Sequence, residues 1–306
     1  MKEYHGCWPT MITPFTPEGK IDFKAVDGLV KWYIRRGCDG IFAVCQSSEM
    51  FYLTKQEKLD LAKATKEAAE GKVKVIASGH TADDHTEQIE ELGKMAETGV
   101  DAVVLVSNRM ANQEEGADVF NRNAEDIFTQ LPQVTFGLYE CPYPYRRLLT
   151  TDFLYDCAKE GKLVFLKDVS CSLPILKERI EKIKGTNLSL FNANTSTLLE
   201  SFKFGADGYN GVMANFHIDL YKWMYLNFKE HPVLAQEVQD FLTLAGVIEA
   251  RCYPVSAKWH QNKYDVPMSL VTRSKDVHLL GENDINELES LHRMEVALRA
   301  KLHLNQ

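Results

Sequence analysis

The strongest constraint on the fold is a steady alternation of short apolar segments with longer amphipathic ones. The apolar segments have the length of β-strands and lie near residues 6–13, 40–44, 73–78, 102–106, 134–139, 163–167, 188–191 and 208–213. Helical patterns separate them at residues 23–36, 55–70, 86–98, 114–130, 151–159, 173–183 and 195–204. Strands that are apolar without alternation are typical of a parallel sheet covered on both faces. The pattern therefore predicts an α/β protein with a parallel sheet.

Eight strand-helix units in strict order predict how that sheet is arranged. Parallel neighbours need right-handed crossovers, and eight such units close naturally into a (β/α)8 TIM barrel. Gly37, Gly71 and Gly99 follow three of the predicted helices, where glycine commonly ends a helix. An open doubly wound sheet is the alternative, and the lack of a G-x-G-x-x-G motif after the first strand counts against it. We expect the barrel to occupy residues 1–215.

The remaining residues, 216–306, are predicted to form a C-terminal helical extension packed on the barrel. Segments 216–228, 233–249 and 285–302 each have apolar residues at the three-four spacing of one helix face. Segment 262–282 is irregular in pattern, and no linker rich in Pro, Gly or Ser separates the extension from the barrel.

Composition narrows the class of partner. The formal net charge is −8 and no long basic block occurs, so neither nucleic acid nor an anionic membrane is expected as the main partner. No signal peptide or membrane-spanning stretch is found, and a cytoplasmic location is the expectation. The seven cysteines include no C-x-x-C pair and are expected to be reduced thiols.

We expect neither a cofactor nor a metal. The nearest approach to a metal-binding cluster in the sequence is His80 and His85 with Asp83 and Asp84 between them, and capping of a helix by these aspartates explains it better.

Two side chains at predicted strand ends suggest covalent chemistry. Lys167 closes the apolar run 163–166, and Tyr139 closes the run one strand-helix unit earlier. Catalytic groups of barrels lie at these carboxyl ends of strands. An amine there can condense with a carbonyl to an iminium, which draws electrons from a neighbouring bond, and a phenol can move the protons. Asp168 should face the other way by strand alternation, which favours a structural role.

Several segments, taken in order, resemble one family. They are GCWPTMITPF at 6–15 with GKID at 19–22, GIFAVCQSSE at 40–49, YECP at 139–142, LKD at 166–168 and GYNGVMAN at 208–215. Together they resemble the superfamily of dihydrodipicolinate synthase and N-acetylneuraminate lyase, the class I aldolases that form a Schiff base with pyruvate. The resemblance spans essentially the whole chain. It implies a TIM barrel, a lyase or aldolase, and a homo-oligomer, either a tetramer or a dimer.

The resemblance also assigns roles to residues of this chain. Lys167 would form the Schiff base with a 2-oxo acid and Tyr139 would shuttle protons. Ser47 and Ser48 would hold the carboxylate, because a hydroxyl-rich turn offers O–H and N–H donors together. Asn210 would line the pocket near the imine. This chain differs from the synthases in the pocket that would hold the rest of the substrate. The candidate lining residues of that pocket are Gln46, Arg109, Tyr143 and Arg146.

Three departures argue against a true dihydrodipicolinate synthase. Gln46 stands where many members have a hydroxyl residue, segment 106–110 lacks the tyrosine that the synthases contribute to a neighbouring subunit, and Pro144 stands where they carry an arginine. The sequence therefore predicts a lyase or aldolase acting on pyruvate, a pyruvate-releasing hydroxy-oxo acid or a sugar acid. Two alternatives stay open: a dehydratase of a deoxy-oxo-sugar acid using the same imine, and a catalytically silent homologue that binds a 2-oxo acid.

Overall fold

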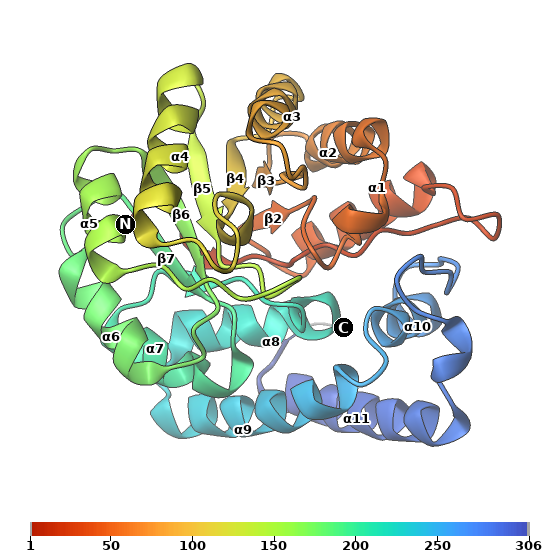
Figure 1. Cartoon of the computed structure of the whole chain (residues 1–306). Coiled ribbons are helices and arrows are strands. Elements are labelled where there is room, and N and C mark those ends of the chain that lie inside the picture. The colour runs from red at the N-terminus through yellow and green to blue at the C-terminus, as the bar shows by residue number, and fades with distance from the viewer. Residues whose placement is uncertain (1, 305–306) are drawn as a thin grey trace.

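The computed structural model describes residues 2–304 as a ring of parallel strands surrounded by helices (Figure 1). The strands are β1 (Gly6–Cys7), β2 (Gly40–Phe42), β3 (Lys74–Ala77), β4 (Ala102–Val106), β5 (Phe136–Tyr139), β6 (Leu163–Asp168), β7 (Ser189–Asn192) and β8 (Gly208–Tyr209). They pair in the order β1-β8-β7-β6-β5-β4-β3-β2, and all pairs are parallel.

The ring closes between β1 and β2. A parallel bridge joins Thr10 to Phe42 just beyond β1, where Met11 N donates to Phe42 O at 3.0 Å and Phe42 N donates to Pro9 O at 3.0 Å. The predicted TIM barrel is confirmed, and the open doubly wound alternative is wrong because the strand order has no reversal. The strands predicted at 6–13 and 208–213 are too long. Each pairs over two residues only, and the chain beyond them belongs to the barrel mouth.

The barrel interior is filled by aromatic rings. The ring centroids of Phe165 and Phe191 lie 4.6 Å apart, and the Trp8 centroid lies 5.7 Å and 5.6 Å from them. Glycine is required at two places beside them. A Cβ on Gly208 would meet Gly6 O at 2.1 Å, and one on Gly40 would meet the Trp8 ring at 2.4 Å. The interior is thus a packed core that leaves only its mouth open for chemistry.

Seven helices follow the first seven strands. They are α1 (Phe23–Arg35), α2 (Lys55–Ala69), α3 (His85–Glu97), α4 (Ala117–Gln130), α5 (Thr151–Lys159), α6 (Leu173–Lys182) and α7 (Leu198–Phe204). Short 3-10 turns lie at η1 (Met50–Tyr52), η2 (Ser107–Arg109) and η3 (Thr195–Thr197). Local capping defines several starts: Thr54 and Glu57 form a capping box on α2, and the Asp84 side chain accepts from Glu87 N at 2.9 Å on α3.

The C-terminal section contains α8 (Ala214–Asn227), α9 (Pro232–Glu249), α10 (Val255–Tyr264), η4 (Val277–Leu279) and α11 (Glu282–Lys301). Helix α8 follows β8 and contacts β1, while α9 and α11 contact each other and run along one side of the barrel (Figure 1). A division of the chain into two domains at residue 215 stays a prediction.

Helix α10 is the element that the sequence did not predict. Its buried face includes Ser256, Lys258, His260 and Gln261, so the apolar three-four spacing is absent. Within residues 2–304, none of the helices combines the length and the apolar character needed to cross a membrane.

Candidate active site

The ends of β5 and β6 place the two predicted catalytic side chains next to each other. Tyr139 pairs in register with Lys167 across the strands, and Lys167 Nζ lies 4.5 Å from the centroid of the Tyr139 ring. The Phe42 centroid lies 5.8 Å from the same nitrogen. Burial lowers the pKa of Lys167 to about 8, although Cys45 and Cys141 act in the opposite direction. At pH 7 roughly a tenth of the amine is then neutral, against about one part in three thousand for an unperturbed lysine.

The Tyr139 phenol is placed to exchange protons. Its hydroxyl donates to Gln46 Oε1 at 3.2 Å, and burial raises its pKa well above the ordinary value. The phenol therefore stays protonated at neutral pH. Beside a partly neutral amine, a protonated phenol can act as the general acid when a carbinolamine loses water.

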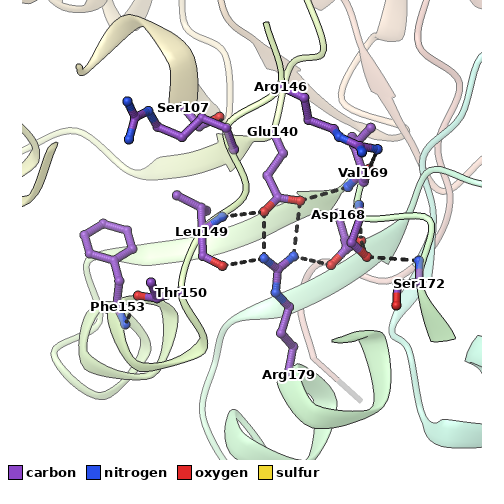
Figure 2. Close-up of polar contacts among 12 residues, drawn as sticks. Ser107, Glu140, Arg146, Leu149, Thr150, Phe153, Asp168, Val169, Ser172 and Arg179 are labelled. Carbon is purple, nitrogen blue, oxygen red and sulfur yellow. Dashed lines mark hydrogen bonds and ion pairs between the residues drawn. The ribbon is translucent and has the colours of Figure 1, made fainter. Parts of the chain in front are cut away.

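The residues directly after these two point outward and bind one guanidinium. Arg179 of α6 donates to both oxygens of Glu140, at 2.8 and 3.1 Å, and also to Asp168 (Figure 2). Its remaining donor contact is Leu149 O at 2.6 Å. Arg179 is 1% exposed and both carboxylates are fully buried. Asp168 thus has the structural role that strand alternation predicted. By binding Glu140 and Asp168 together, Arg179 connects the ends of β5 and β6 on the side away from the site.

A cavity of about 300 Å³ opens above Tyr139. Its walls are formed by Gln46, Ser47, Glu49, Phe51, Tyr52, Tyr139, Tyr143, Val212, Tyr253, Pro254, Ser274 and Lys275. Lys167 is not among these lining residues, but its amine lies 4.5 Å from the centroid of the Tyr139 ring, which does line the cavity. The predicted Gln46, Ser47, Tyr139 and Tyr143 are brought together here.

The two predicted serines differ in their surroundings. Ser47 lines the cavity, and its hydroxyl donates to Thr10 Oγ1 at 3.1 Å. The Ser48 hydroxyl faces the main chain instead, contacting Ala43 O and donating to Met11 O at 2.6 Å. Ser47 is therefore better placed to meet a carboxylate.

Three other predicted residues lie outside the cavity lining. The Arg109 guanidinium pairs with Asp83 at 2.5 Å and lies 5.6 Å from the centroid of Phe51, which does line the cavity. Arg146 is exposed and donates to Val169 O at 3.3 Å (Figure 2). Asn210 is buried at the end of β8, where its Nδ2 donates to Trp8 O at 2.9 Å. Their substrate-binding roles stay predictions.

The histidines considered as metal ligands in the sequence have separate partners. His80 Nδ1 accepts from Val106 N at 3.0 Å, whereas His85 Nε2 lies 2.8 Å from the Asp126 carboxylate.

Sequence reasoning missed the cavity residues that come from the C-terminal section. Tyr253, Ser274 and Lys275 reach the cavity from segments around α10, in the part of the chain without a periodic pattern. Glu49 supports this arrangement, since its carboxylate accepts from the backbone N–H groups of Arg273 and Ser274, each at 2.7 Å. No sequence motif marks these residues. Their place depends on how a long segment returns over the barrel mouth.

Comparisons with known proteins agree with this architecture. A profile described as the Dihydrodipicolinate synthetase family matches residues 3–283. A 4-hydroxy-tetrahydrodipicolinate synthase of Oceanobacillus iheyensis is 29% identical over 266 residues, covering 85% of this chain and 88% of the relative. An N-acetylneuraminate lyase of Mediterraneibacter gnavus is 26% identical over 209 residues, covering 68% and 65%.

A solved structure described as a catalytic lysine mutant of Ruminococcus gnavus sialic acid aldolase superimposes with a TM-score of 0.87 at 17% identity, covering 99% of this chain and all of that one. At this identity the structural likeness concerns the fold. The profile match over nearly the whole length carries the further conclusion that the chain belongs to the dihydrodipicolinate synthetase family and is a lyase of the class I aldolase type.

Proposed function

We propose that this protein cleaves a 4-hydroxy-2-oxo acid, such as a sugar acid, and releases pyruvate through a Schiff base on Lys167. The observation that carries the proposal is the desolvated amine of Lys167 against the Tyr139 ring, at 4.5 Å, with its pKa lowered to about 8 by burial. The similarity to an N-acetylneuraminate lyase, 26% identical over 209 residues, supports the same type of chemistry.

The reaction follows from the two side chains. The neutral Lys167 Nζ adds to the C2 carbonyl, and the Tyr139 hydroxyl protonates the carbinolamine oxygen, which leaves as water. The resulting iminium accepts the electron pair of the C3–C4 bond, while the Tyr139 phenolate takes the proton of the C4 hydroxyl. An aldehyde leaves and an enamine remains on the lysine. Protonation of the enamine at C3 and hydrolysis of the imine then release pyruvate and regenerate the amine.

Gln46 supports a lyase over a dihydrodipicolinate synthase. Its amide oxygen accepts a hydrogen bond from the Tyr139 hydroxyl at 3.2 Å, at the position where many synthases carry a hydroxyl group. An amide oxygen accepts a hydrogen bond but cannot pass a proton on as a hydroxyl does. The aromatic walls of the cavity, Phe51 and Tyr143, and the ammonium group of Lys275 offer a different environment for the distal part of the substrate.

Substrate profiling tests this proposal. The purified protein is incubated with a panel of 4-hydroxy-2-oxo acids that includes N-acetylneuraminate, and pyruvate is followed with a coupled lactate dehydrogenase assay. We expect pyruvate release from at least one sugar acid, and none with Lys167→Ala. Mass analysis of the products identifies dehydration, which would remove water and leave the carbon chain whole. The proposal is overturned if every substrate is only dehydrated or bound, or if formation of 4-hydroxy-tetrahydrodipicolinate is the fastest reaction.

A further inference from the structure

We propose that the C-terminal helices carry a divalent-cation site suited to Zn²⁺, formed by His260 Nε2 of α10 with His292 Nδ1 and Glu295 Oε2 of α11. The Glu295 Oε2 atom lies 3.5 Å from His260 Nε2 and 3.4 Å from His292 Nδ1. One ligand atom from each residue lies within 4.8 Å of the other two. A tetrahedral ion with bonds of about 2.0–2.1 Å holds its ligands roughly 3.4 Å apart, so two of the three separations already match.

The three ligand atoms are buried and lack hydrogen bonds. His260 is 2% exposed and Glu295 is fully buried, while the His292 side chain is 23% exposed at the rim. The contacts of Glu295 Oε2 with His260 Nε2 and His292 Nδ1, at 3.5 and 3.4 Å, are longer than ordinary hydrogen bonds, and none of the three atoms has another hydrogen-bond partner among the described residues. Buried polar atoms are nearly always satisfied in proteins, and one cation would satisfy all three at once.

Neighbouring side chains orient these ligands. The other carboxylate oxygen of Glu295 pairs with Arg299 and lies 3.1 Å from His217 Nδ1, which leaves Oε2 to face the two imidazoles. The His292 ring stacks on Tyr264 with centroids 3.5 Å apart and an angle of 6° between the planes. His292 and Glu295 share one face of α11 because they are three residues apart. Such supporting contacts are typical of metal sites.

The other charged neighbours of the cluster have partners that leave Glu295 Oε2 open. The His217 imidazole lies between two carboxylates, with Nε2 against Glu249 and Nδ1 3.1 Å from Glu295 Oε1, so its nitrogens do not face the proposed ion. Arg299 is shared with Asp219, with its donors 2.7 and 2.9 Å from the carboxylate oxygens. The carboxylate of Glu295 therefore remains available as an anionic ligand.

Ligand type and access favour Zn²⁺ with one open position. Two imidazoles and one carboxylate form a ligand set typical of zinc sites that keep a fourth position for water. His292 and Tyr264 border a cavity of about 660 Å³, which gives an ion a path from solvent. Neither residue lines the cavity above Tyr139, so this site is separate from the proposed catalytic one.

Metal analysis of the full-length protein tests the inference. The protein is stripped with a chelator, titrated with Zn²⁺, passed over a desalting column and analysed for bound metal, with thermal unfolding measured in parallel. We expect one equivalent of Zn²⁺ per chain and a rise in Tm. Co²⁺ in place of Zn²⁺ should give the visible absorption of a four-coordinate nitrogen–oxygen site.

The His292→Gln and His260→Gln variants should bind Zn²⁺ about a hundredfold more weakly or worse, since loss of a direct ligand costs at least as much as loss of a supporting contact. His278→Gln, at an exposed histidine of η4, is the matched control and should bind like the unmodified chain. His292 lies at the rim, and its variant should keep the circular dichroism and pyruvate release of the parent. Equal zinc content in His292→Gln and His278→Gln, or no retained zinc and no Tm shift in the parent, overturns the proposal.

Discussion

At the scale of single residues, the environment of Lys167 decides its chemistry. The rings of Phe42 and Tyr139 lie against its amine, and within residues 2–304 none of the carboxylates forms an ion pair with it. The adjacent Asp168 is instead bound to Arg179. Without a counter-charge, burial disfavours the ammonium form, which keeps part of the amine nucleophilic at neutral pH.

The lowered pKa predicts how imine formation depends on pH. Burial destabilises the ammonium form and brings the pKa of Lys167 to about 8, so the neutral fraction grows as pH rises through that value. The rate of imine formation with pyruvate should therefore rise about tenfold per unit below pH 8 and level off above it. Rapid-quench trapping between pH 6 and 10 measures this profile. If the rate of imine formation kept rising above pH 8, with a pH midpoint near the pKa of free lysine, the lowered pKa of Lys167 would be contradicted.

Removal of one hydroxyl tests the proton-transfer role. Tyr139→Phe keeps the ring against Lys167 but loses the donor to Gln46, and kcat for pyruvate release should fall by about 10²–10⁴. The Tm should stay close to that of the parent, because the ring still fills its place. Tyr155→Phe, a half-buried tyrosine of α5, is the control and should leave kcat unchanged. A kcat of Tyr139→Phe within threefold of the parent, roughly 0.7 kcal/mol of activation free energy, would contradict the role.

At the scale of elements, the ends of β5 and β6 act as one unit. Each strand points one side chain toward the mouth, Tyr139 or Lys167, and the next side chain toward Arg179 on α6. The spacing between amine and phenol is therefore maintained by an ion-pair network on the opposite side of the strands.

Loss of that guanidinium should destabilise the fold. Arg179→Ala leaves the carboxylates of Glu140 and Asp168 buried without their cation, and breaking a buried pair costs about 3–5 kcal/mol. Urea denaturation measures the free energy of unfolding. Arg122→Ala, at an exposed position of α4, is the control and should change it by less than about 0.5 kcal/mol. An unfolding free energy of Arg179→Ala equal to that of the control would contradict a stabilising network.

The same elements explain what the sequence could predict. Apolar runs mark buried strands, so the ends of β5 and β6 and the pairing of Tyr139 with Lys167 followed from the pattern. Helix α10 could not be predicted from the apolar pattern, because its buried residues include polar ones such as Lys258 and His260. The positions of Arg109 and Arg146 depend on loop conformation, which periodicity does not encode, and both lie outside the cavity lining.

At the scale of the whole molecule, the C-terminal section contributes to two features. Tyr253 and Lys275 complete the cavity over the barrel mouth. On the outer surface, α9 exposes three apolar side chains along one face: Val233 at 73%, Leu244 at 64% and Val247 at 65%. Apolar side chains aligned on an exposed helix face are typical of contacts between subunits.

The α9 face predicts a homo-oligomer, as membership of the family also suggests. Sedimentation velocity should show a dimer or tetramer of the 34.8 kDa chain. A Leu244→Glu/Val247→Glu double variant should sediment as smaller species than the parent protein. Burying a charged side chain in an apolar contact costs free energy, so the contact between subunits should weaken. Phe23→Glu, at another exposed apolar residue, is the control and should keep the parent assembly. A parent protein that sediments as a monomer would contradict the prediction.

Covalent capture of a 2-oxo acid tests the central claim most directly. The protein is incubated with saturating pyruvate, reduced with borohydride, digested and analysed by mass spectrometry. We predict a single reduced pyruvate per chain, attached to the Nζ atom of Lys167, and no such adduct in Lys167→Ala. An unmodified Lys167 at saturating pyruvate, or an adduct on a different lysine, would contradict the proposed Schiff-base mechanism.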